Sequence, residues 1–286
     1  MTIQFFAKTI QGWVIKSPLE AFTFPGGEAH IKGADDPTEY EYQLADMRGA
    51  DSHDLITLTM WSDVCLDRGE KTVLLLPYLP GARADRGVPF GAQVYADLFN
   101  RMFIDQIITV DPHSEVMPGL FHNHEKIVRD NLTVYPFERL LRKAVGSVDS
   151  DETQHHYVGV IAPDKGAVDR AQRAADVLHV PLFKAEKVRD FDTGKLSGFS
   201  CEELPTEGRL LLVDDICDGG GTFNGLADHL KEEQGIGMKR LDLWVTHGIF
   251  SKGTRELVKR FNHIITTDSH PGVTAHNESY IHVEPV

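Results

Sequence analysis

The sequence predicts an α/β protein with two domains, each a mostly parallel sheet flanked by helices. Short, continuous apolar runs alternate along the chain with stretches of helical periodicity. Such runs are typical of strands buried on both faces, and their alternation with helices favours parallel sheets. The length of 286 residues is enough for about two domains. We place these domains at residues 1–133 and 134–286, and allow the last residues to return to the first domain.

In the first half we predict a strand, a helix and a second strand, at Val73–Leu76, Gly91–Phe103 and Ile107–Val110. Pro77 stops the first strand. The helix carries Val94, Leu98 and Met102 on one face, which is the spacing of a buried helical stripe. This order of elements is typical of a parallel strand–helix–strand unit.

In the second half four apolar runs predict strands, at Tyr157–Ala162, Leu210–Val213, Leu241–Thr246 and Ile264–Thr267. Three helical patterns accompany them, at Ala167–Leu178, Phe223–Glu233 and Lys252–Phe261. The most polar stretch, Gly146–His156, is interpreted as a loop within this half. Strand–helix alternation therefore continues through the second domain.

The acidic composition limits the classes of partner. There are 29 Lys and Arg against 43 Asp and Glu, a net charge of -14, so we expect no nucleic-acid partner, because counterion release needs surplus cations. No apolar run approaches the roughly 18 residues of a membrane span, and the N-terminus lacks a signal-peptide pattern. Cys65, Cys201 and Cys217 have no paired spacing. We expect a cytoplasmic protein without disulfides, structural zinc or membrane contact.

The most informative segment is Leu210–Asn224, LLLVDDICDGGGTFN. An apolar strand ends in Asp214 and Asp215, and three glycines then lead to a helix that Thr222 opens. Glycines let backbone N–H groups approach a phosphate, and a helix N-terminus adds positive partial charge. Carboxylates at a strand's carboxyl end can bind ribose hydroxyls or Mg²⁺, while a threonine can cap the helix or bind the phosphate. The alternative interpretation is an ordinary tight turn with an acidic rim.

This segment resembles the ribose-5-phosphate loop of the phosphoribosyltransferase fold, in which two acidic residues and a spacer precede D-T-G-G-T. The resemblance implies that seven residues bind ribose and its 5-phosphate: Asp214, Asp215, Asp218, Gly219, Gly220, Gly221 and Thr222. Gly219 stands where the family usually has threonine. The loop alone does not separate transferases, which consume phosphoribosyl pyrophosphate, from synthetases, which make it.

Two segments of the first half are similar to ribose-phosphate pyrophosphokinases. Pro77–Arg86, PYLPGARADR, resembles that family's P-Y-x-x-Y-A-R-Q-D-R, and Thr109–Glu115, TVDPHSE, resembles its T-V-D-L-H-x-x-Q. The resemblance implies an ATP site that includes Arg83, Asp85, Arg86 and His113. Guanidinium forks suit phosphate oxygens better than an ammonium does. Without the resemblance, Pro77–Arg86 would be interpreted as a surface loop with solvated charges.

Two segments of the second half continue the resemblance. Ile161–Gly166, IAPDKG, resembles P-D-x-G-G, which implies that Asp164 shares a Mg²⁺ ion with His113. Lys184–Phe191, KAEKVRDF, corresponds to a flexible loop with K-x-R. Lys187 and Arg189 would then be the catalytic cations, which balance charge on the transferred phosphoryl oxygens.

The adenine end of the ATP site is represented by Phe24–Glu28, FPGGE, which resembles F-x-D-G-E. Phe24 would stack on the base and Glu28 would contact it. Gly26 replaces the aspartate of that segment, so recognition of the base is expected to differ.

The resemblance implies an ATP-dependent pyrophosphokinase with Mg²⁺ as cofactor. Such an enzyme transfers the β,γ-diphosphate of ATP to the anomeric hydroxyl of a ribose-5-phosphate unit and releases AMP. Ribose 5-phosphate is the expected acceptor, with ADP-ribose as an alternative because the departures at Gly26 and Gly219 cluster at the substrate ends. A phosphoribosyltransferase and a non-catalytic regulatory subunit remain rival interpretations. We also expect a homo-oligomer, at least a dimer.

Overall fold

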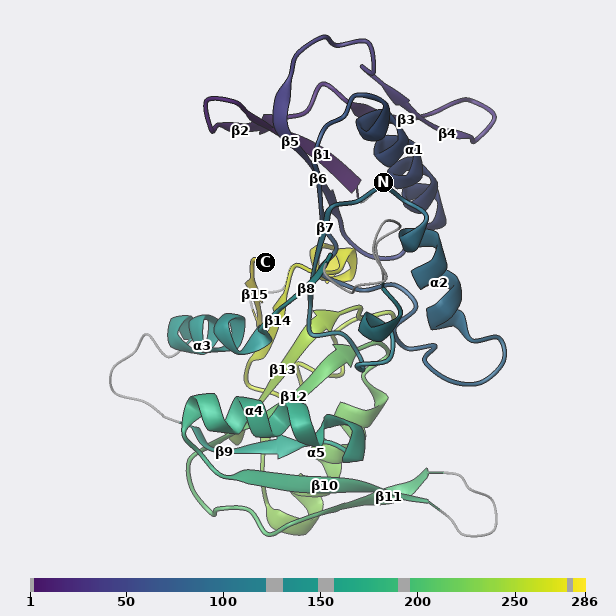
Figure 1. Cartoon of the computed structure of the whole chain (residues 1–286). Coiled ribbons are helices and arrows are strands. Elements are labelled where there is room, and N and C mark those ends of the chain that lie inside the picture. The colour runs from purple at the N-terminus through teal and green to yellow at the C-terminus, as the bar shows by residue number, and fades with distance from the viewer. Residues whose placement is uncertain (1–2, 122–130, 149–156, 190–195, 277–279) are drawn as a thin grey trace. The chain divides into compact units, whose positions relative to one another are not determined.

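Figure 1 shows a computed structural model of the chain, which describes residues 3–121, 131–148, 157–189, 196–276 and 280–286. The chain divides into two compact units, Met1–Tyr135 and Pro136–Val286. The division lies two residues beyond the boundary placed from the sequence. Both units are α/β, so the predicted fold class is confirmed.

The first unit is built on a six-stranded sheet. Its order is β2-β1-β5-β6-β7-β8, with bounds β1 Ile3–Thr9, β2 Val14–Lys16, β5 Tyr40–Met47, β6 Thr72–Leu75, β7 Gln106–Val110 and β8 Leu132–Tyr135. The strands from β5 to β8 pair parallel, whereas β1 pairs antiparallel with both β2 and β5. A separate antiparallel hairpin consists of β3, Glu20–Thr23, and β4, Ala29–Lys32.

Helices α1, Ser52–Asp67, and α2, Gly91–Asn100, share one core with this sheet, and η1, Pro118–Leu120, is a short 3-10 turn. The buried face of α2 is Ala92, Ala96 and Phe99. The predicted stripe was wrong at Val94 and Leu98, which are 54% and 44% exposed. Small alanines let the helix backbone approach the sheet closely, so they occupy the inner face in place of the larger side chains.

The second unit has a seven-stranded sheet in the order β11-β10-β9-β12-β13-β14-β15. Its strands are β9 Tyr157–Ala162, β10 Leu182–Arg189, β11 Leu196–Cys201, β12 Arg209–Cys217, β13 Leu241–Gly248, β14 Ile264–Thr267 and β15 Ile281–Glu284. All pairs are parallel except β10 with β11. Strand β15, which includes Ile281–Glu284 near the end of the chain, pairs with β14 at the edge of this sheet.

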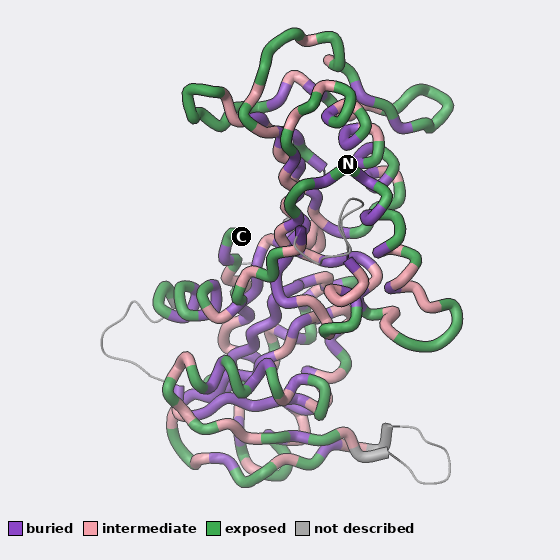
Figure 2. Tube along the Cα trace, in the orientation of Figure 1, coloured by how far each residue is buried: buried purple, intermediate pink, exposed green. Residues whose placement is uncertain are grey.

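Helices cover this second sheet, with bounds α3 Phe137–Val148, α4 Val168–Leu178 and α5 Gly221–Gln234, and with 3-10 turns η2 Lys165–Ala167, η3 Met238–Arg240 and η4 Pro271–His276. Strand β12 is buried on both faces (Figure 2). Leu210 and Leu212 share a core cluster with Leu226 and Leu230 of α5. Because strand side chains alternate, Leu211 and its neighbours on the other face are buried against the opposite layer.

Two further sequence predictions were wrong in this unit. No helix is assigned over residues 252–261; residues 255–260 form turns instead, with helix-like bonds such as that from the Val258 N–H to the Thr254 carbonyl. The K-x-R segment, predicted as a flexible loop, belongs to strand β10, where Lys187 lies opposite Phe199 of β11. Within the described ranges, no helix combines the length and the apolar character that crossing a membrane requires.

Candidate functional site

The carboxyl end of β12 leads directly into the N-terminus of α5. Gly220, at φ 73°, is the residue that caps the helix, and no side chain caps it. This left-handed conformation suits glycine, and a β-carbon here would lie 3.3 Å from Leu257. The first backbone N–H groups of α5 therefore keep their hydrogen-bonding capacity for an anion.

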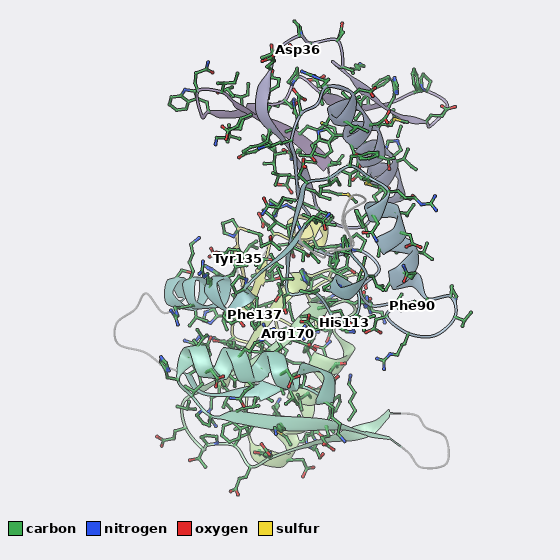
Figure 3. The ribbon with its side chains drawn as sticks, in the orientation of Figure 1. Asp36, Phe90, His113, Tyr135, Phe137 and Arg170 are labelled. Atoms are coloured by element: carbon green, nitrogen blue, oxygen red, sulfur yellow. The ribbon has the colours of Figure 1, made fainter. Side chains whose placement is uncertain are left out.

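Two carboxylates at the end of β12 face a buried arginine of α4. Arg170 lies 3.7 Å from an oxygen of Asp214 and 3.8 Å from an oxygen of Asp215. The helix buries Ala171, Ala174 and Ala175 beside it, and these small side chains let the arginine approach the strand. Figure 3 labels Arg170 on this helix. The carboxylate pair is thus balanced by one guanidinium.

Burial raises the pKa of Asp214 well above its ordinary value, and the neighbouring charge of Asp215 raises it further. Arg170 acts in the opposite direction. Burial and Asp215 thus favour the neutral form of Asp214, and Arg170 favours the ionised form. A ligand that donates hydrogen bonds, such as a ribose hydroxyl, favours the ionised state.

The loop that follows is fixed by the segment after β13. The backbone N–H groups of Ile249 and Phe250 donate to the carbonyl of Cys217, each at 3.0 Å, and the N–H of Ser251 donates to the carbonyl of Asp218. The Ser251 hydroxyl also donates to the Asp218 carboxylate at 2.5 Å. The start of the glycine loop is consequently held in place before any ligand binds.

Lysine 252 fills the space beside Gly219. A β-carbon added at Gly219 would lie 3.2 Å from Cδ and 3.3 Å from Cε of Lys252. These contacts are tighter than ordinary packing, so a threonine at 219 would require the lysine stem to move. The missing side chain at Gly219 therefore leaves no empty space in the loop.

Asp164 and Lys187 form an ion pair, with Nζ of Lys187 2.7 Å from Oδ2 of Asp164. The other oxygen of Asp164 accepts the backbone N–H of Gly166 at 2.9 Å. The structure thus joins the predicted metal ligand and one predicted catalytic cation. The side chain of Arg189, the other predicted cation, lies outside the described residues, although its backbone ends β10.

In the first unit, the predicted ATP segments follow the adjacent parallel strands β6 and β7. The N–H of Val110 and the hydroxyl of Thr109 both donate to the carbonyl of Pro77. Further along, the Ser114 hydroxyl donates to the Asp85 carboxylate at 2.8 Å. These bonds place the segment of Arg83 and that of His113 next to each other.

The charged groups of this region are accessible. Arg86 lies 3.6 Å from Asp85, and its side chain is 89% exposed. Arg83 is also exposed, and His113 is partly buried. Exposed guanidinium groups beside a strand end provide an arrangement that can bind polyphosphate.

The β3–β4 hairpin carries the predicted adenine contacts. Phe24 is 45% exposed, stacks on His30 at 5.4 Å between ring centroids and meets Phe22 edge-on at 4.8 Å. A β-carbon at Gly26 would lie 2.5 Å from Oε2 of Glu28. The Glu28 carboxylate therefore occupies the space in which the side chain of an aspartate at 26 would begin.

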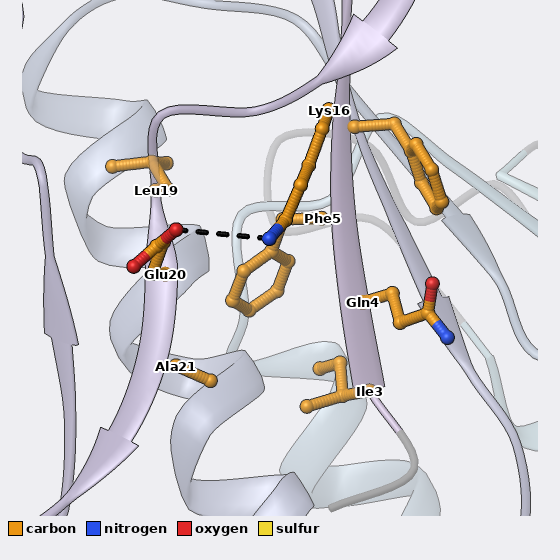
Figure 4. Close-up of a pocket in the computed structure, with 8 residues that line it drawn as sticks. Ile3, Gln4, Phe5, Lys16, Leu19, Glu20 and Ala21 are labelled. Atoms are coloured by element: carbon orange, nitrogen blue, oxygen red, sulfur yellow. Dashed lines mark ion pairs between the residues drawn. The ribbon is translucent and has the colours of Figure 1, made fainter.

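A separate pocket of about 430 Å³ lies beside β1 and β3 in the first unit (Figure 4). Its lining includes Phe5 together with Lys16 and Glu20, whose charged groups are 3.7 Å apart. It contains none of the residues that the sequence assigned to ligands. The candidate site residues other than those of the hairpin lie instead at the strand ends described above, some in each unit.

Four residues that position these groups were not identified from the sequence: Arg170, Ser114, Ser251 and Lys252. An arginine on a helix face of alanines was a usable signal for Arg170, since a charge on an apolar face needs a partner. The other three act through contacts between segments far apart in the chain, which local patterns do not reveal.

A comparison with protein families matches residues 131–273 to the phosphoribosyl transferase domain. The chain is 30% identical over 209 residues to a ribose-phosphate pyrophosphokinase of Bradyrhizobium diazoefficiens, which covers 68% of this chain and 59% of that protein. It is 28% identical over 263 residues to a ribose-phosphate pyrophosphokinase of Pyrococcus abyssi, which covers 88% of this chain and 84% of that protein. The chain thus spans less than two thirds of one relative and most of the other.

Among solved structures, the fold is similar to the crystal structure of phosphoribosylpyrophosphate synthetase from Mycobacterium smegmatis. The TM-score is 0.73 at 24% sequence identity, and the match covers 93% of this chain and 85% of that one. At this identity the likeness concerns the fold, and it extends over both units.

Proposed function

The chain belongs to the ribose-phosphate pyrophosphokinase family, and on this premise we propose that it transfers the β,γ-diphosphate of ATP to the anomeric hydroxyl of a ribose-5-phosphate unit. The hydroxyl oxygen at C1 bonds to the β-phosphorus and loses its proton. The bond from the β-phosphorus to the oxygen that bridges it to the α-phosphorus breaks, and AMP leaves. With ribose 5-phosphate as acceptor, the product is phosphoribosyl pyrophosphate.

One observation supports a synthetase over a lone transferase. Besides the unit that carries the glycine loop, the chain has a complete α/β unit, Met1–Tyr135, in which the Ser114–Asp85 hydrogen bond holds an arginine-bearing segment beside that of His113. A phosphoribosyltransferase, which does not use ATP, has no role for this cationic segment. An ATP site therefore explains residues that the rival interpretation leaves without function.

In the proposed mechanism, the residues act mainly by position and charge. The backbone N–H groups from Gly219 to Thr222 bind the 5-phosphate, and Asp214 and Asp215 accept hydrogen bonds from ribose hydroxyls. Arg83, Asp85, Arg86 and His113 bind and orient the triphosphate, while Phe24 and Glu28 contact adenine. Lys187 and Arg189 balance charge that develops on the transferred group.

The donor set suits Mg²⁺. Within the described ranges, no cluster of three or more His, Cys, Asp or Glu side chains could hold a metal ion. Mg²⁺ is usually bound through one or two protein ligands together with substrate phosphates and water, and a single part-exposed carboxylate such as Asp164 meets that need. We therefore propose Asp164 as a protein ligand of the ion, with His113 as the second ligand that the resemblance to the family implies. When bound, the ion would neutralise phosphate charge.

A second acceptor, ADP-ribose, is favoured by a specific observation. The loop that would bind the 5-phosphate differs from the family pattern at Gly219, and a lysine stem lies against that position. A changed phosphate loop is expected if the phosphate itself is substituted. The anomeric hydroxyl that reacts would be the same, and the product would be ADP-ribose pyrophosphate, which would serve the resynthesis of NAD⁺.

The test is to incubate the protein with Mg·ATP and either ribose 5-phosphate or ADP-ribose, and to identify the products by mass. AMP together with a diphosphorylated acceptor is the expected result, and it identifies the acceptor. Release of pyrophosphate from phosphoribosyl pyrophosphate with a base, and no use of ATP, would instead identify a transferase. Binding of ATP without AMP formation from either acceptor would identify a non-catalytic subunit.

A further inference from the structure

Lysine 252 is held against the phosphate loop by the segment that carries it. The residue just before it, Ser251, donates to Asp218 through both its backbone N–H and its hydroxyl. Phe250 is buried and adopts φ 49°, an uncommon conformation that turns the chain toward the loop. Gly253, at φ 72°, closes this turn with a bond from its N–H to the carbonyl of Phe250.

The stem of Lys252 lies along Gly219, because its Cδ, Cε and Cγ would be 3.2, 3.3 and 3.6 Å from a β-carbon there. The ammonium is one bond of about 1.5 Å beyond Cε. Its nitrogen is therefore within about 5 Å of the position that a side chain at 219 would occupy.

The charge of this ammonium is not compensated within the described part of the chain, where Lys252 forms no hydrogen bond or ion pair. The nearby carboxylates have other partners, since Asp218 accepts from Ser251 and Asp214 and Asp215 face Arg170. A cation beside an uncapped helix N-terminus adds to the positive potential that this terminus already creates.

We propose that Lys252 binds the 5-phosphate of the acceptor and takes the place of the side chain absent at Gly219. The proposal rests on the proposed function. Glycine at 219 is what allows the lysine stem to lie over the loop, so the two residues act as a pair. The ammonium of Lys252 thereby replaces the neutral hydroxyl donor of the threonine that the family usually has at this position. It would donate a charge-assisted hydrogen bond to the acceptor phosphate.

The test is to compare Lys252→Met with the wild type in steady-state kinetics. Methionine keeps an apolar stem over Gly219 and removes only the charge. We expect KM for the acceptor to rise by about tenfold to a hundredfold, the usual cost of losing a hydrogen bond to a charged group. KM for ATP and kcat should change less than about twofold. The effect should appear with whichever acceptor the wild type uses, because both carry the 5-phosphate.

Two further variants separate this role from a structural one. Lys239→Met removes an exposed lysine from η3, before the opposite end of β13, and should leave KM for the acceptor unchanged. Gly219→Thr should displace the lysine stem. In that background, Lys252→Met should raise KM for the acceptor less than about threefold, a non-additivity that independent residues would not show.

An acceptor KM for Lys252→Met within about twofold of the wild type would overturn the proposal, as would full additivity with Gly219→Thr. If the wild type forms no AMP with either acceptor, the proposed function fails, and the role of Lys252 is then judged by calorimetric binding of inorganic phosphate. Weaker phosphate binding by Lys252→Met than by Lys239→Met would support the role, and equal binding would refute it.

Discussion

Lysine 187 is the residue whose removal tests the proposed chemistry most directly. Its ammonium lies 2.7 Å from the Asp164 carboxylate and its side chain is 27% exposed, so it is fixed in position yet accessible to a ligand. Lys187→Ala should lower kcat by about two to three orders of magnitude, the usual cost of losing one preorganised donor to developing charge. Steady-state AMP formation under saturating substrates is the measurement.

The matched control is Lys165→Ala. Lys165 is 82% exposed, and its ammonium lies 3.5 Å from the carboxylate of Glu186 in β10. Its replacement by alanine therefore removes one positive charge beside β10, as Lys187→Ala does. Its kcat should stay within about twofold of the wild type. Turnover of Lys187→Ala within about threefold of the wild type would contradict the role of Lys187. Unfolding in urea should show little change for either variant, because part-exposed ion pairs contribute about 1 kcal/mol or less.

Arginine 170 should control stability in a pH-dependent way. Arg170→Met leaves the buried carboxylates without their cation, so we expect a loss of about 3 kcal/mol in the free energy of unfolding at pH 7. The pKa of Asp214, already raised mainly by burial and by Asp215, should rise further. Urea unfolding at pH 7 and pH 5 is the measurement.

The sign of the pH effect follows from linkage. A carboxyl group whose pKa is higher in the folded chain than the unfolded value of about 3.9 contributes stability when protonated. That stability is lost as the pH rises toward the folded pKa. The loss in free energy of unfolding caused by Arg170→Met, relative to the wild type, should therefore be smaller at pH 5 than at pH 7. A deficit that is constant or larger at pH 5 would argue against Asp214 as its source. Arg142→Met, on the exposed face of α3, should have little effect at either pH.

Among the residues assigned to the site, the segment from Asp214 to Thr222 is suggestive from its chemistry alone, whereas the other assignments rest on the resemblance to the family. The carboxylates before three glycines, for example, do lie at a strand end beside a helix N-terminus. The ion pair of Asp164 with Lys187 was not predictable, because the two residues come from different segments that β9 and β10 bring together. Arg170, by contrast, had a usable local signal, because it lies among buried alanines on α4.

Helix α5 owes its open N-terminus to Gly220, and this gives a prediction for the element. Gly220→Ala places a β-carbon at φ 73° and 3.3 Å from Leu257. We expect a loss of about 1–2 kcal/mol in the free energy of unfolding from the left-handed backbone. KM for the acceptor should also rise, because the phosphate loop must shift. Unfolding and acceptor kinetics are measured on the same variant.

Gly235→Ala provides the control at the other end of the same helix. Gly235 has φ 68°, and a β-carbon there meets no atom within 4 Å. Gly235→Ala should lower the free energy of unfolding by a similar amount, because its backbone is also left-handed, and it should leave KM for the acceptor unchanged. An equal rise in acceptor KM for both variants would mean that helix stability, and not the shape of the loop, governs binding.

The elements best predicted from the sequence are the fully buried parallel strands. Tyr157–Ala162 and Ile264–Thr267 have the bounds expected for β9 and β14, because a strand buried on both faces must be continuously apolar. The antiparallel strands of the first unit were not predicted. Their faces differ in exposure, which interrupts the apolar runs. Leu257 and Phe261 have the i, i+4 spacing of a helix, which is why a helix was predicted at 252–261. Both side chains are buried, but the segment does not form a helix.

At the scale of the whole chain, the net charge of -14 has to be reconciled with the anionic ligands proposed here. Long-range repulsion between exposed charges is screened within about 8–10 Å at physiological salt. Within each unit, local cations can make the potential favourable for phosphates: Arg83 in the first, and Lys187 and Lys252 with the N-terminus of α5 in the second. An acidic protein can bind these ligands if its cations are concentrated at strand ends.

The division of the chain into two units predicts that the second can fold alone. Its apolar cluster runs from Ile161 to Val273 and includes no residue of the first unit, whose own cluster runs from Ile3 to Phe121. A unit of this size with its own core is expected to have a free energy of unfolding of about 5–15 kcal/mol. The isolated segment Pro136–Val286 should therefore unfold cooperatively in urea.

The isolated segment Pro136–Val286 also tests whether acceptor binding and turnover depend on different units. It retains the loop from Asp214 to Thr222 and should bind ribose 5-phosphate or ADP-ribose in calorimetry, whereas it lacks Arg83 and His113 and should form no AMP from ATP. Non-cooperative unfolding would mean that the two cores depend on each other. AMP formation by the isolated segment would show that the ATP site does not require the first unit, and the roles proposed for Arg83 and His113 would then have to be abandoned.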